Sequence, residues 1–102
     1  MHAELHRAAL EELAEAIDWY DSRVEGLGEE LEKEVWATVH RIEQLPHARA
    51  PWRYDPRYRF ARVERFPYAL PYAILDDFIL MLAVAHERRR TGYWLSRATD
   101  AR

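Results

Sequence analysis

Residues 58–94 read YRFARVERFPYALPYAILDDFILMLAVAHERRRTGYW. The first part alternates arginines with aromatic and small residues, and the stretch then becomes an almost unbroken apolar run from Phe78 to Ala85. It closes in a cationic and aromatic cluster that ends at Trp94. Alternation and short apolar runs between turn residues are typical of strands. The pattern predicts a sheet that presents positive charge to a partner.

We expect three strands in this part of the chain. The first spans 57–66, with arginines on both faces and aromatic residues on one of them. The second spans 70–75, and Pro71 within it predicts a bulge or an edge position, because proline cannot donate to the ladder. A tight link at 76–77 leads to the third strand, 78–86. That strand is apolar on both faces, which predicts a central position covered on both sides.

Two helices are expected before these strands. From Arg7 the apolar residues recur at spacings of three and four, namely Leu10, Leu13, Ile17, Tyr20 and Val24. Gly26-Leu27-Gly28 stops this helix, because glycine adopts the left-handed conformation that closes a helix. The second helix opens at Glu29 and ends before Pro46, with the apolar face Leu31, Val35, Val39, Ile42 and Leu45. The short link predicts an antiparallel hairpin, with Trp19 and Trp36 packed against the sheet edge or the other helix.

The expected fold is a single α+β domain over residues 1–102. A short first strand at 2–6 precedes the helical hairpin, and a loop at 47–57 precedes a three-stranded antiparallel meander, all forming one curved sheet. We expect the first strand to lie beside the last apolar strand, with the helices covering one side of the sheet. The opposite side is expected to stay open, aromatic and lined with arginines.

Composition limits the class of protein. Hydrophobic residues make up 49% of the chain and aromatic residues 13%, which is ample for a core. The chain has no cysteine, so thiolate chemistry and disulfides are excluded. No apolar run approaches the ~20 residues that span a bilayer, and the N-terminal segment lacks the apolar centre of a signal peptide. We therefore expect a cytoplasmic protein with no membrane association.

Charge is distributed unevenly along the chain. Residues 1–45 carry four basic and twelve acidic side chains, a net charge of −8, whereas residues 46–102 carry eleven arginines and six acids, a net charge of +5. Lys33 is the only lysine in the sequence. Arginine's planar group suits two-pronged contacts to carboxylate or phosphate. The asymmetry predicts an acidic solvated layer and a basic working face.

Candidate chemistry lies in the basic half. The five histidines are scattered and show no metal-ligand spacing, and the sequence has neither a glycine-rich phosphate loop nor a nucleophile elbow, so we expect no metal and no cofactor. The candidate constellation consists of Arg59, Arg62, Arg65, His86, Arg88, Arg89, Arg90 and Tyr93. Arginines hold phosphates and stabilise developing negative charge. The same residues suit protein or nucleic-acid binding, catalysis, or simple solvated charge, and spacing alone leaves these alternatives open.

The whole chain resembles the RelE/ParE superfamily of bacterial type II toxins. The matching residues are Ala16, Trp19-Tyr20, Gly26-Leu27-Gly28, Pro46, Arg65-Phe66-Pro67-Tyr68, Tyr72, Leu82-Ala83-Val84, His86, Arg89 and Tyr93-Trp94. The resemblance implies the fold described above, followed by a C-terminal segment. It also implies a toxin that inhibits growth and is neutralised by a cognate antitoxin in a hetero-oligomer. The basic, aromatic face suits an acidic, partly disordered antitoxin tail.

The resemblance implies two competing targets. RelE-like toxins cleave mRNA on the ribosome, and Arg62, Arg89 and Tyr93 match their catalytic positions: the arginines would bind the scissile phosphate and the tyrosine would assist proton transfer. However, Ala69 and Phe60 stand where that branch usually has an arginine and a lysine, and losing one such donor costs ~10²–10³ in rate. ParE-like toxins poison DNA gyrase without this set.

We therefore expect a ParE-like toxin, with a RelE-like ribonuclease or a non-toxic antitoxin-binding protein as alternatives. The sequence pI of about 5.9 is also unusual for a toxin that binds ribosomes. Whatever the target, the residues expected to bind the antitoxin or the target are Arg59, Arg65, Tyr68, Tyr72, His86, Arg88, Arg90 and Trp94.

Overall fold

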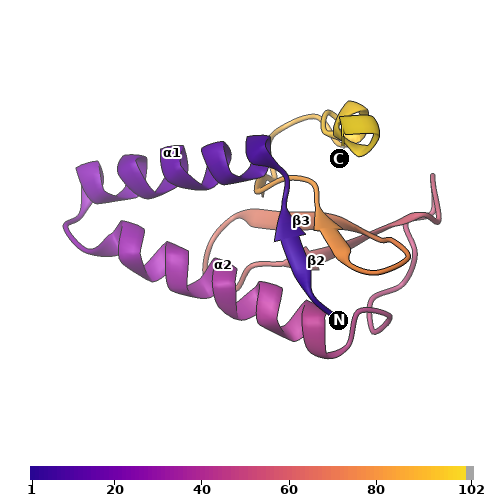
Figure 1. Cartoon of the computed structure of the whole chain (residues 1–102). Helices are drawn as coiled ribbons and strands as arrows, with labels where there is room; N and C mark the ends of the chain where they lie inside the picture. Colours follow the sequence, from indigo (N-terminus) through magenta and orange to yellow (C-terminus); the bar gives the residue numbers. More distant parts are fainter. Residues whose placement is uncertain (101–102) are drawn as a thin grey trace.

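The computed structural model describes residues 1–100 as two helices packed on a mixed sheet (Figure 1). In chain order the elements are β1 (Ala3–Leu5), α1 (Arg7–Arg23), α2 (Leu27–Gln44), β2 (Tyr58–Arg62), β3 (Tyr68–Ile74), β4 (Ile79–Met81), β5 (Ala85–His86) and the short 3₁₀ helix η1 (Leu95–Asp100). The α+β class and the expected order of elements are confirmed. None of the helices in this part of the chain is both long and apolar enough to cross a membrane.

The sheet has the strand order β1-β4-β3-β2, and β5 pairs with β3 beyond the end of β4. β1 runs parallel to β4, with Leu5 opposite Met81, while β2, β3 and β4 form antiparallel pairs. The expectation that the first strand lies beside the last apolar strand is therefore confirmed. Because β4 is central, its three residues are buried, and they alternate between the cores on the two faces of the sheet.

The turn between the two helices lies at the glycines, as predicted. α1 ends at Arg23 and α2 begins at Leu27, two residues earlier than expected, after Gly26 in the left-handed region (φ 86°). The backbone N–H of Gly28 donates to Asp21 Oδ1 at 2.7 Å, and a Cβ atom at Gly28 would lie 2.4 Å from the carbonyl oxygen of Ile17. The missing side chain of Gly28 therefore lets the two helices approach closely.

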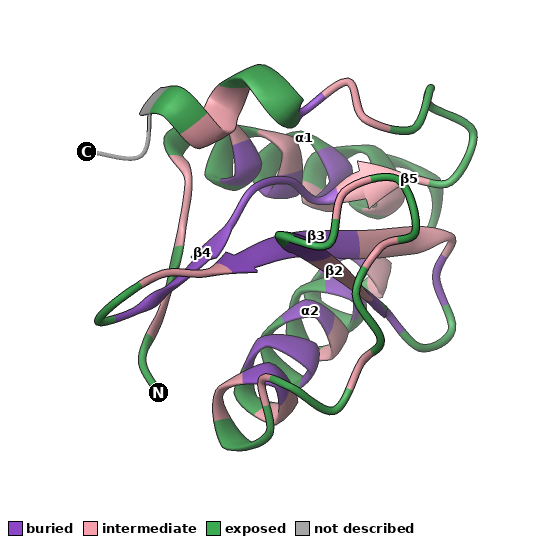
Figure 2. Ribbon diagram, turned by 90° about the vertical axis from the view of Figure 1, so that its right-hand side faces the viewer, coloured by how far each residue is buried: buried purple, intermediate pink, exposed green. Residues whose placement is uncertain are grey.

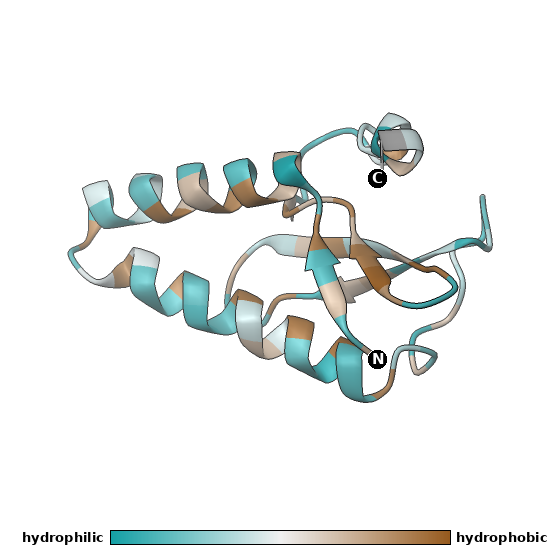
Figure 3. Cartoon of the chain, viewed as in Figure 1, coloured by the Kyte–Doolittle hydropathy of each residue, from teal (hydrophilic) through white to brown (hydrophobic). Residues whose placement is uncertain are grey.

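The apolar faces of both helices turn toward the sheet (Figure 3). α2 buries Leu31, Val35, Val39 and Ile42 as predicted. α1 buries the predicted Leu13 together with Ala9 and Ala16, and the predicted Ile17 and Tyr20 pack against the same core. The predicted Leu10 and Val24, at the two ends, are instead about half exposed. Trp19 and Trp36 are 51% and 41% exposed, so each is only about half covered.

The predicted strand 78–86 is interrupted. Between the pairs Tyr72–Met81 and Ala69–Ala85, the two residues Leu70 and Pro71 of β3 face three residues, 82–84. The Pro71 carbonyl accepts a hydrogen bond from the Leu82 N–H at 2.8 Å, but proline has no N–H to return. Pro71 is buried within a central strand and not at an edge. The expected bulge exists, and its extra residue is on the partner strand.

The face of the sheet opposite the helices is also covered, which corrects the expectation of an open face. The loop before β2 and the segment after β5 lie across it (Figure 2) and form a second core, which contains Tyr58, Phe78, Leu80, Leu82 and Trp94. Trp94 is 1% exposed, and its ring centroid lies 5.3–5.6 Å from those of Trp52, Tyr58 and Phe60. Aromatic side chains from irregular segments thus cover this face of the sheet, as the two helices cover the other face.

Candidate functional site

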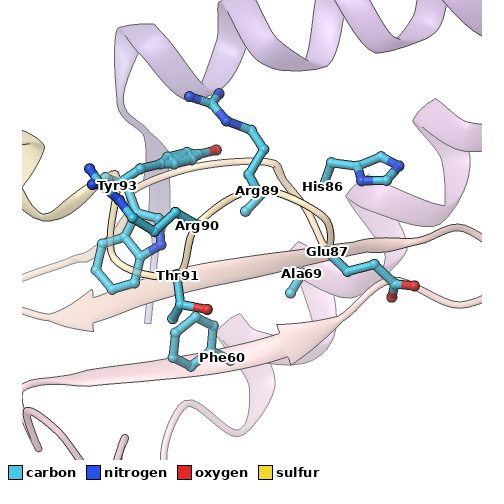
Figure 4. A pocket seen from close by; sticks show the side chains of 10 residues that line it. Phe60, Ala69, His86, Glu87, Arg89, Arg90, Thr91 and Tyr93 are labelled. Atoms are coloured by element: carbon cyan, nitrogen blue, oxygen red, sulfur yellow. The ribbon is translucent and has the colours of Figure 1, made fainter.

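A hollow of about 200 Å³ lies between β3 and the segment that follows β5 (Figure 4). Its lining consists of Phe60, Ala69, Ala85, His86, Glu87, Arg89, Arg90, Thr91, Tyr93 and Trp94. The segment 86–94 contributes most of the polar groups, and the strands contribute an uncharged floor of Phe60, Ala69 and Ala85. Five of the sequence-predicted residues are brought together around it, namely His86, Arg89, Arg90, Tyr93 and Trp94.

Arg89 and Tyr93, two of the three candidate catalytic residues, are held by a carboxylate from α1. The Tyr93 hydroxyl donates to Glu12 Oε2 at 2.9 Å, and the Arg89 guanidinium pairs with the same oxygen at 3.3 Å. Arg89 also lies over the Tyr93 ring, 3.6 Å from its centroid. In Figure 4 the Arg89 side chain extends away from Phe60 and Ala69 on the pocket floor. Its charge is therefore directed to Glu12 and not into the hollow.

The pKa of Tyr93 is raised to about 12. Burial is the largest cause, because it disfavours the phenolate, and the hydrogen bond to the negative Glu12 adds to it, while Arg89 and Arg97 oppose it. Tyr93 consequently remains protonated at neutral pH and acts as a hydrogen-bond donor.

Arg97 completes this group, and sequence analysis had singled out neither it nor Glu12. The two Arg97 amino groups donate to the two Glu12 oxygens at 3.0 and 2.9 Å, and one of them also donates to the Leu82 carbonyl at 3.0 Å. Both side chains are largely buried, at 18% and 13% exposed. The hydrogen bond to Glu12 is the main reason that the pKa of Arg97 is raised. The sequence does not single out Glu12 as a partner of these residues, because it is one of several acids on an acidic helix.

The third candidate catalytic residue, Arg62, lies apart from this group. It is at the end of β2, its side chain is 74% exposed, and it pairs with Glu87 at 3.5 Å. It does not line the hollow. The three residues of the predicted catalytic set are thus divided between an exposed strand end and the Glu12 contacts.

Two other arginines serve the fold. Arg59 donates to the backbone carbonyls of His47 and Arg49 and so fixes the loop before β2. Arg65, in a positive-φ turn (72°), pairs with Glu30 at 2.6 Å and Glu34 at 3.5 Å on α2. The hydrogen bond to Glu30 is the largest cause of its raised pKa. Both side chains are engaged within the chain, at a distance from the hollow's lining.

Two of the aromatic binding candidates are interior. Tyr72 is fully buried, and its hydroxyl donates to the Pro46 carbonyl at 2.7 Å; burial is also the main cause of its raised pKa. Trp94 lies in the second core described above. Both side chains are therefore buried in the interior, although Trp94 also lines the hollow.

Tyr68 and His86 instead border the surface beside α1. Their rings meet edge to face at 5.2 Å, and with Trp19 and Tyr20 they line a hollow of about 260 Å³. Burial raises the pKa of Tyr68 to about 12. His86 Nδ1 accepts a hydrogen bond from the Arg88 backbone N–H at 3.1 Å, which fixes the turn that begins the 86–94 segment.

Arg88 and Arg90 are exposed, and neither forms an ion pair within residues 1–100. They are the free positive charges of the basic run, because Arg89 between them turns to Glu12. No three His, Asp or Glu side chains in the described part of the chain are grouped to hold a metal ion.

Comparison with known proteins identifies the relatives of this arrangement. The sequence model of the family described as "ParE toxin of type II toxin-antitoxin system, parDE" matches residues 3–91. Among solved structures, the fold is similar to a chain of "Chromosomal ParDE TA system from P. aeruginosa", with a TM-score of 0.74 and 19% identity over 84% of this chain and 95% of that one. No curated protein sequence matches the chain.

Proposed function

The chain belongs to the family of ParE toxins of type II toxin–antitoxin systems, and we propose that it inhibits growth by poisoning DNA gyrase and not by cutting mRNA. The observation that supports this choice is the engagement of Arg89 and Tyr93 by Glu12. A phosphodiester cleaver needs cations directed at the phosphate and a group poised to move a proton. Here Arg89 and Tyr93, the candidates for these two roles, donate instead to the carboxylate of Glu12.

The floor of the hollow supports the same choice. Phe60, Ala69 and Ala85 bring no charge to it. Arg62 lies outside it and is exposed, where solvent screens its charge. Tyr93, with its pKa near 12, cannot accept a proton at neutral pH. Gyrase inhibition through a protein–protein contact requires none of these groups.

Induced expression in bacteria tests the proposal. We expect growth arrest with intact transcript ends, and inhibition of gyrase supercoiling by the purified protein. The variant Tyr93→Phe keeps the ring but removes the hydroxyl, so it should leave gyrase inhibition largely intact. The variant Tyr54→Phe, which removes the hydroxyl of an exposed tyrosine in the loop before β2, is the matched control. Codon-linked mRNA cuts that disappear in Tyr93→Phe would instead identify a RelE-like ribonuclease.

The family implies a partner antitoxin, and we propose that its acidic segment contacts Arg88 and Arg90 and places an apolar side chain against Tyr68 and His86. Neither arginine forms an ion pair with another residue in the range 1–100, and the neighbouring hollow is aromatic. Opposite charges steer encounter and specify partners. Reversing both charges (Arg88→Glu with Arg90→Glu) should weaken co-purification with the antitoxin. Arg53 is an exposed arginine in the loop before β2, and Arg53→Glu should not weaken it. Equal retention of all variants would argue against this contact.

A further inference from the structure

The Glu12 carboxylate accepts five hydrogen bonds. Oε1 accepts from the Val84 backbone N–H at 3.0 Å and from Arg97 at 3.0 Å. Oε2 accepts from Arg97 at 2.9 Å, the Tyr93 hydroxyl at 2.9 Å and Arg89 at 3.3 Å. These donors come from the strand break and from the C-terminal segment, and they converge on one side chain of α1. We call them the Glu12 cradle.

Two of the donors in the cradle, Arg89 and Arg97, are also held by contacts that do not involve Glu12. The Val84 N–H is left without a strand partner by the break opposite Pro71. Arg97 is fixed by the Leu82 carbonyl at 3.0 Å, and Arg89 by the face of the Tyr93 ring at 3.6 Å. Preformed donors of this kind cost little reorganisation when they bind an anion.

The chemistry of the cradle is that of a phosphate site. Two guanidinium groups, a phenol and a backbone N–H are the donors that proteins use for phosphate oxygens. The cradle carries two positive charges, and Glu12 supplies one negative charge. Because Glu12 is 13% exposed, a phosphate entering the cradle would either face its charge at close range or leave it buried without a partner.

We propose that the Val84 amide, Arg89, Tyr93 and Arg97 form an anion-binding site that the chain's own Glu12 occupies, and that Glu12 excludes RNA phosphates from it. Glu12 is then a specificity-determining residue: it leaves the arginines in place but denies them to a polynucleotide. Building an unfavourable contact against the wrong ligand is an established route to specificity. The inference extends the proposed function, since it accounts for a toxin that keeps part of a phosphate-binding set without cutting RNA.

The test compares Glu12→Ala with Glu15→Ala. Both variants remove one negative charge from the same helix, but Glu15 is exposed and outside the cradle. Binding of a short, fluorescently labelled single-stranded RNA is measured by anisotropy, with inorganic phosphate as competitor. We expect Glu12→Ala to bind the RNA at least about tenfold more tightly than the unmodified chain, because a close, poorly solvated charge is worth more than an exposed one. Glu15→Ala should change the affinity much less, and phosphate should displace RNA from Glu12→Ala.

Adding Arg97→Ala to Glu12→Ala locates the effect, because it should abolish the gained affinity if the cradle binds the phosphate. Near-ultraviolet circular dichroism, to which all four tryptophans contribute, establishes that each variant is folded. If Glu12→Ala does not fold, Glu12→Gln, which keeps the size and one acceptor oxygen, is judged by the same criteria. Equal RNA affinity in the Glu12 and Glu15 variants, or a gain that survives Arg97→Ala, would overturn the inference. Since this assay uses purified protein and RNA alone, its failure leaves the gyrase result unaffected.

Discussion

The two faces of the sheet are buried by different means. On one face, α1 and α2 lay regular apolar side chains such as Leu31 and Ile42 against the strands. On the other, the loop before β2 and the segment after β5 supply aromatic rings. Trp94, from the segment after β5, packs against the rings of Trp52, Tyr58 and Phe60. The apolar residues that cover the first face recur with the period of a helix. The second face is covered by segments whose apolar residues have no regular spacing.

The candidate catalytic residues are associated with only one of the two faces. The helix-covered face contains no candidate catalytic residue. The other face is covered by the same segment that carries Arg89, Tyr93 and Arg97, and Glu12 reaches this segment from the N-terminal part of α1. Figure 1 shows η1 at the end of the molecule where α1 begins. The geometry of the site therefore depends on how firmly the C-terminal segment is held.

The largest expected effect comes from removing the main anchor of that segment. Trp94→Ala should lower the free energy of unfolding by about 3–5 kcal/mol, because it opens a large cavity in the second core. Ile42→Ala, the matched change on the helix face, should cost about 2–5 kcal/mol. Urea denaturation measures both. Only Trp94→Ala should also raise the hydrogen exchange of residues 89–97, since only that change frees the segment.

A Trp94→Ala protein as stable as the unmodified chain would show that the second face is a loose cover. Equal effects of both variants on exchange at 89–97 would show that the two faces unfold as one unit. Either result would remove the distinction between them.

A smaller effect is expected at the helical hairpin. Gly28→Asn should destabilise the fold by about 1–3 kcal/mol, because its Cβ would lie 2.4 Å from the Ile17 carbonyl oxygen, which belongs to the backbone and cannot move aside easily. Gly26→Asn is the control: the site is open, and asparagine tolerates the left-handed conformation at a helix junction. Thermal unfolding of both variants checks the difference. If Gly26→Asn were the more damaging change, backbone conformation and not close packing would set the hairpin.

The helix face could be predicted from the sequence because its information is local. The spacing of Leu31, Val35, Val39 and Ile42 places them on one side of any helix. The same logic failed at the ends of α1, where Leu10 and Val24 are exposed. Leu10 is exposed although its neighbour Ala9 is fully buried, and Val24 follows the last residue of α1, so periodicity alone did not fix the ends of the buried face.

The site could be predicted only in part, because its contacts are distant in the sequence. The motif around His86 and Tyr93 lies in the segment that lines the hollow. The partner of Tyr93 and Arg97 is Glu12, 81 and 85 residues away, and no spacing rule connects them. Pro71 shows the same limit: a bulge was expected, but its extra residue belongs to the strand opposite.

Two arginines that pair with helix glutamates distinguish the faces further. Arg97→Ala should cost about 1–3 kcal/mol, because it removes two of the five hydrogen bonds to the largely buried Glu12 and the hydrogen bond to the Leu82 carbonyl. Arg65→Ala should leave stability nearly unchanged, since its pairs with Glu30 and Glu34 are exposed to solvent. Chemical denaturation at low and high salt tests this pair. The Arg97 effect should persist in salt, and an Arg65 effect of equal size would contradict the assignment of Glu12 as a buried anchor.

The smallest effect concerns pH. The pKa of Tyr93 and that of Tyr68 are each raised from 10.0 to about 12 in the folded chain. The folded state thus keeps these protons at pH values where the unfolded state loses them. The resulting stability is fully present below about pH 10 and is lost as the pH rises toward about 12.

The titrations of the two tyrosines can be distinguished by changing Glu12, because Glu12 contributes to the raised pKa of Tyr93 but not to that of Tyr68. In Glu12→Gln, one phenolate should therefore appear at lower pH, while the Tyr68 titration stays in place. Absorbance of the phenolate during alkaline titration measures this, with Tyr93→Phe and Tyr68→Phe identifying each transition. A Glu12→Gln curve that superimposes on that of the unmodified chain would mean that burial alone raises the pKa of Tyr93. The C-terminal segment would then be held over the sheet by its aromatic rings, without a measurable electrostatic contribution from α1.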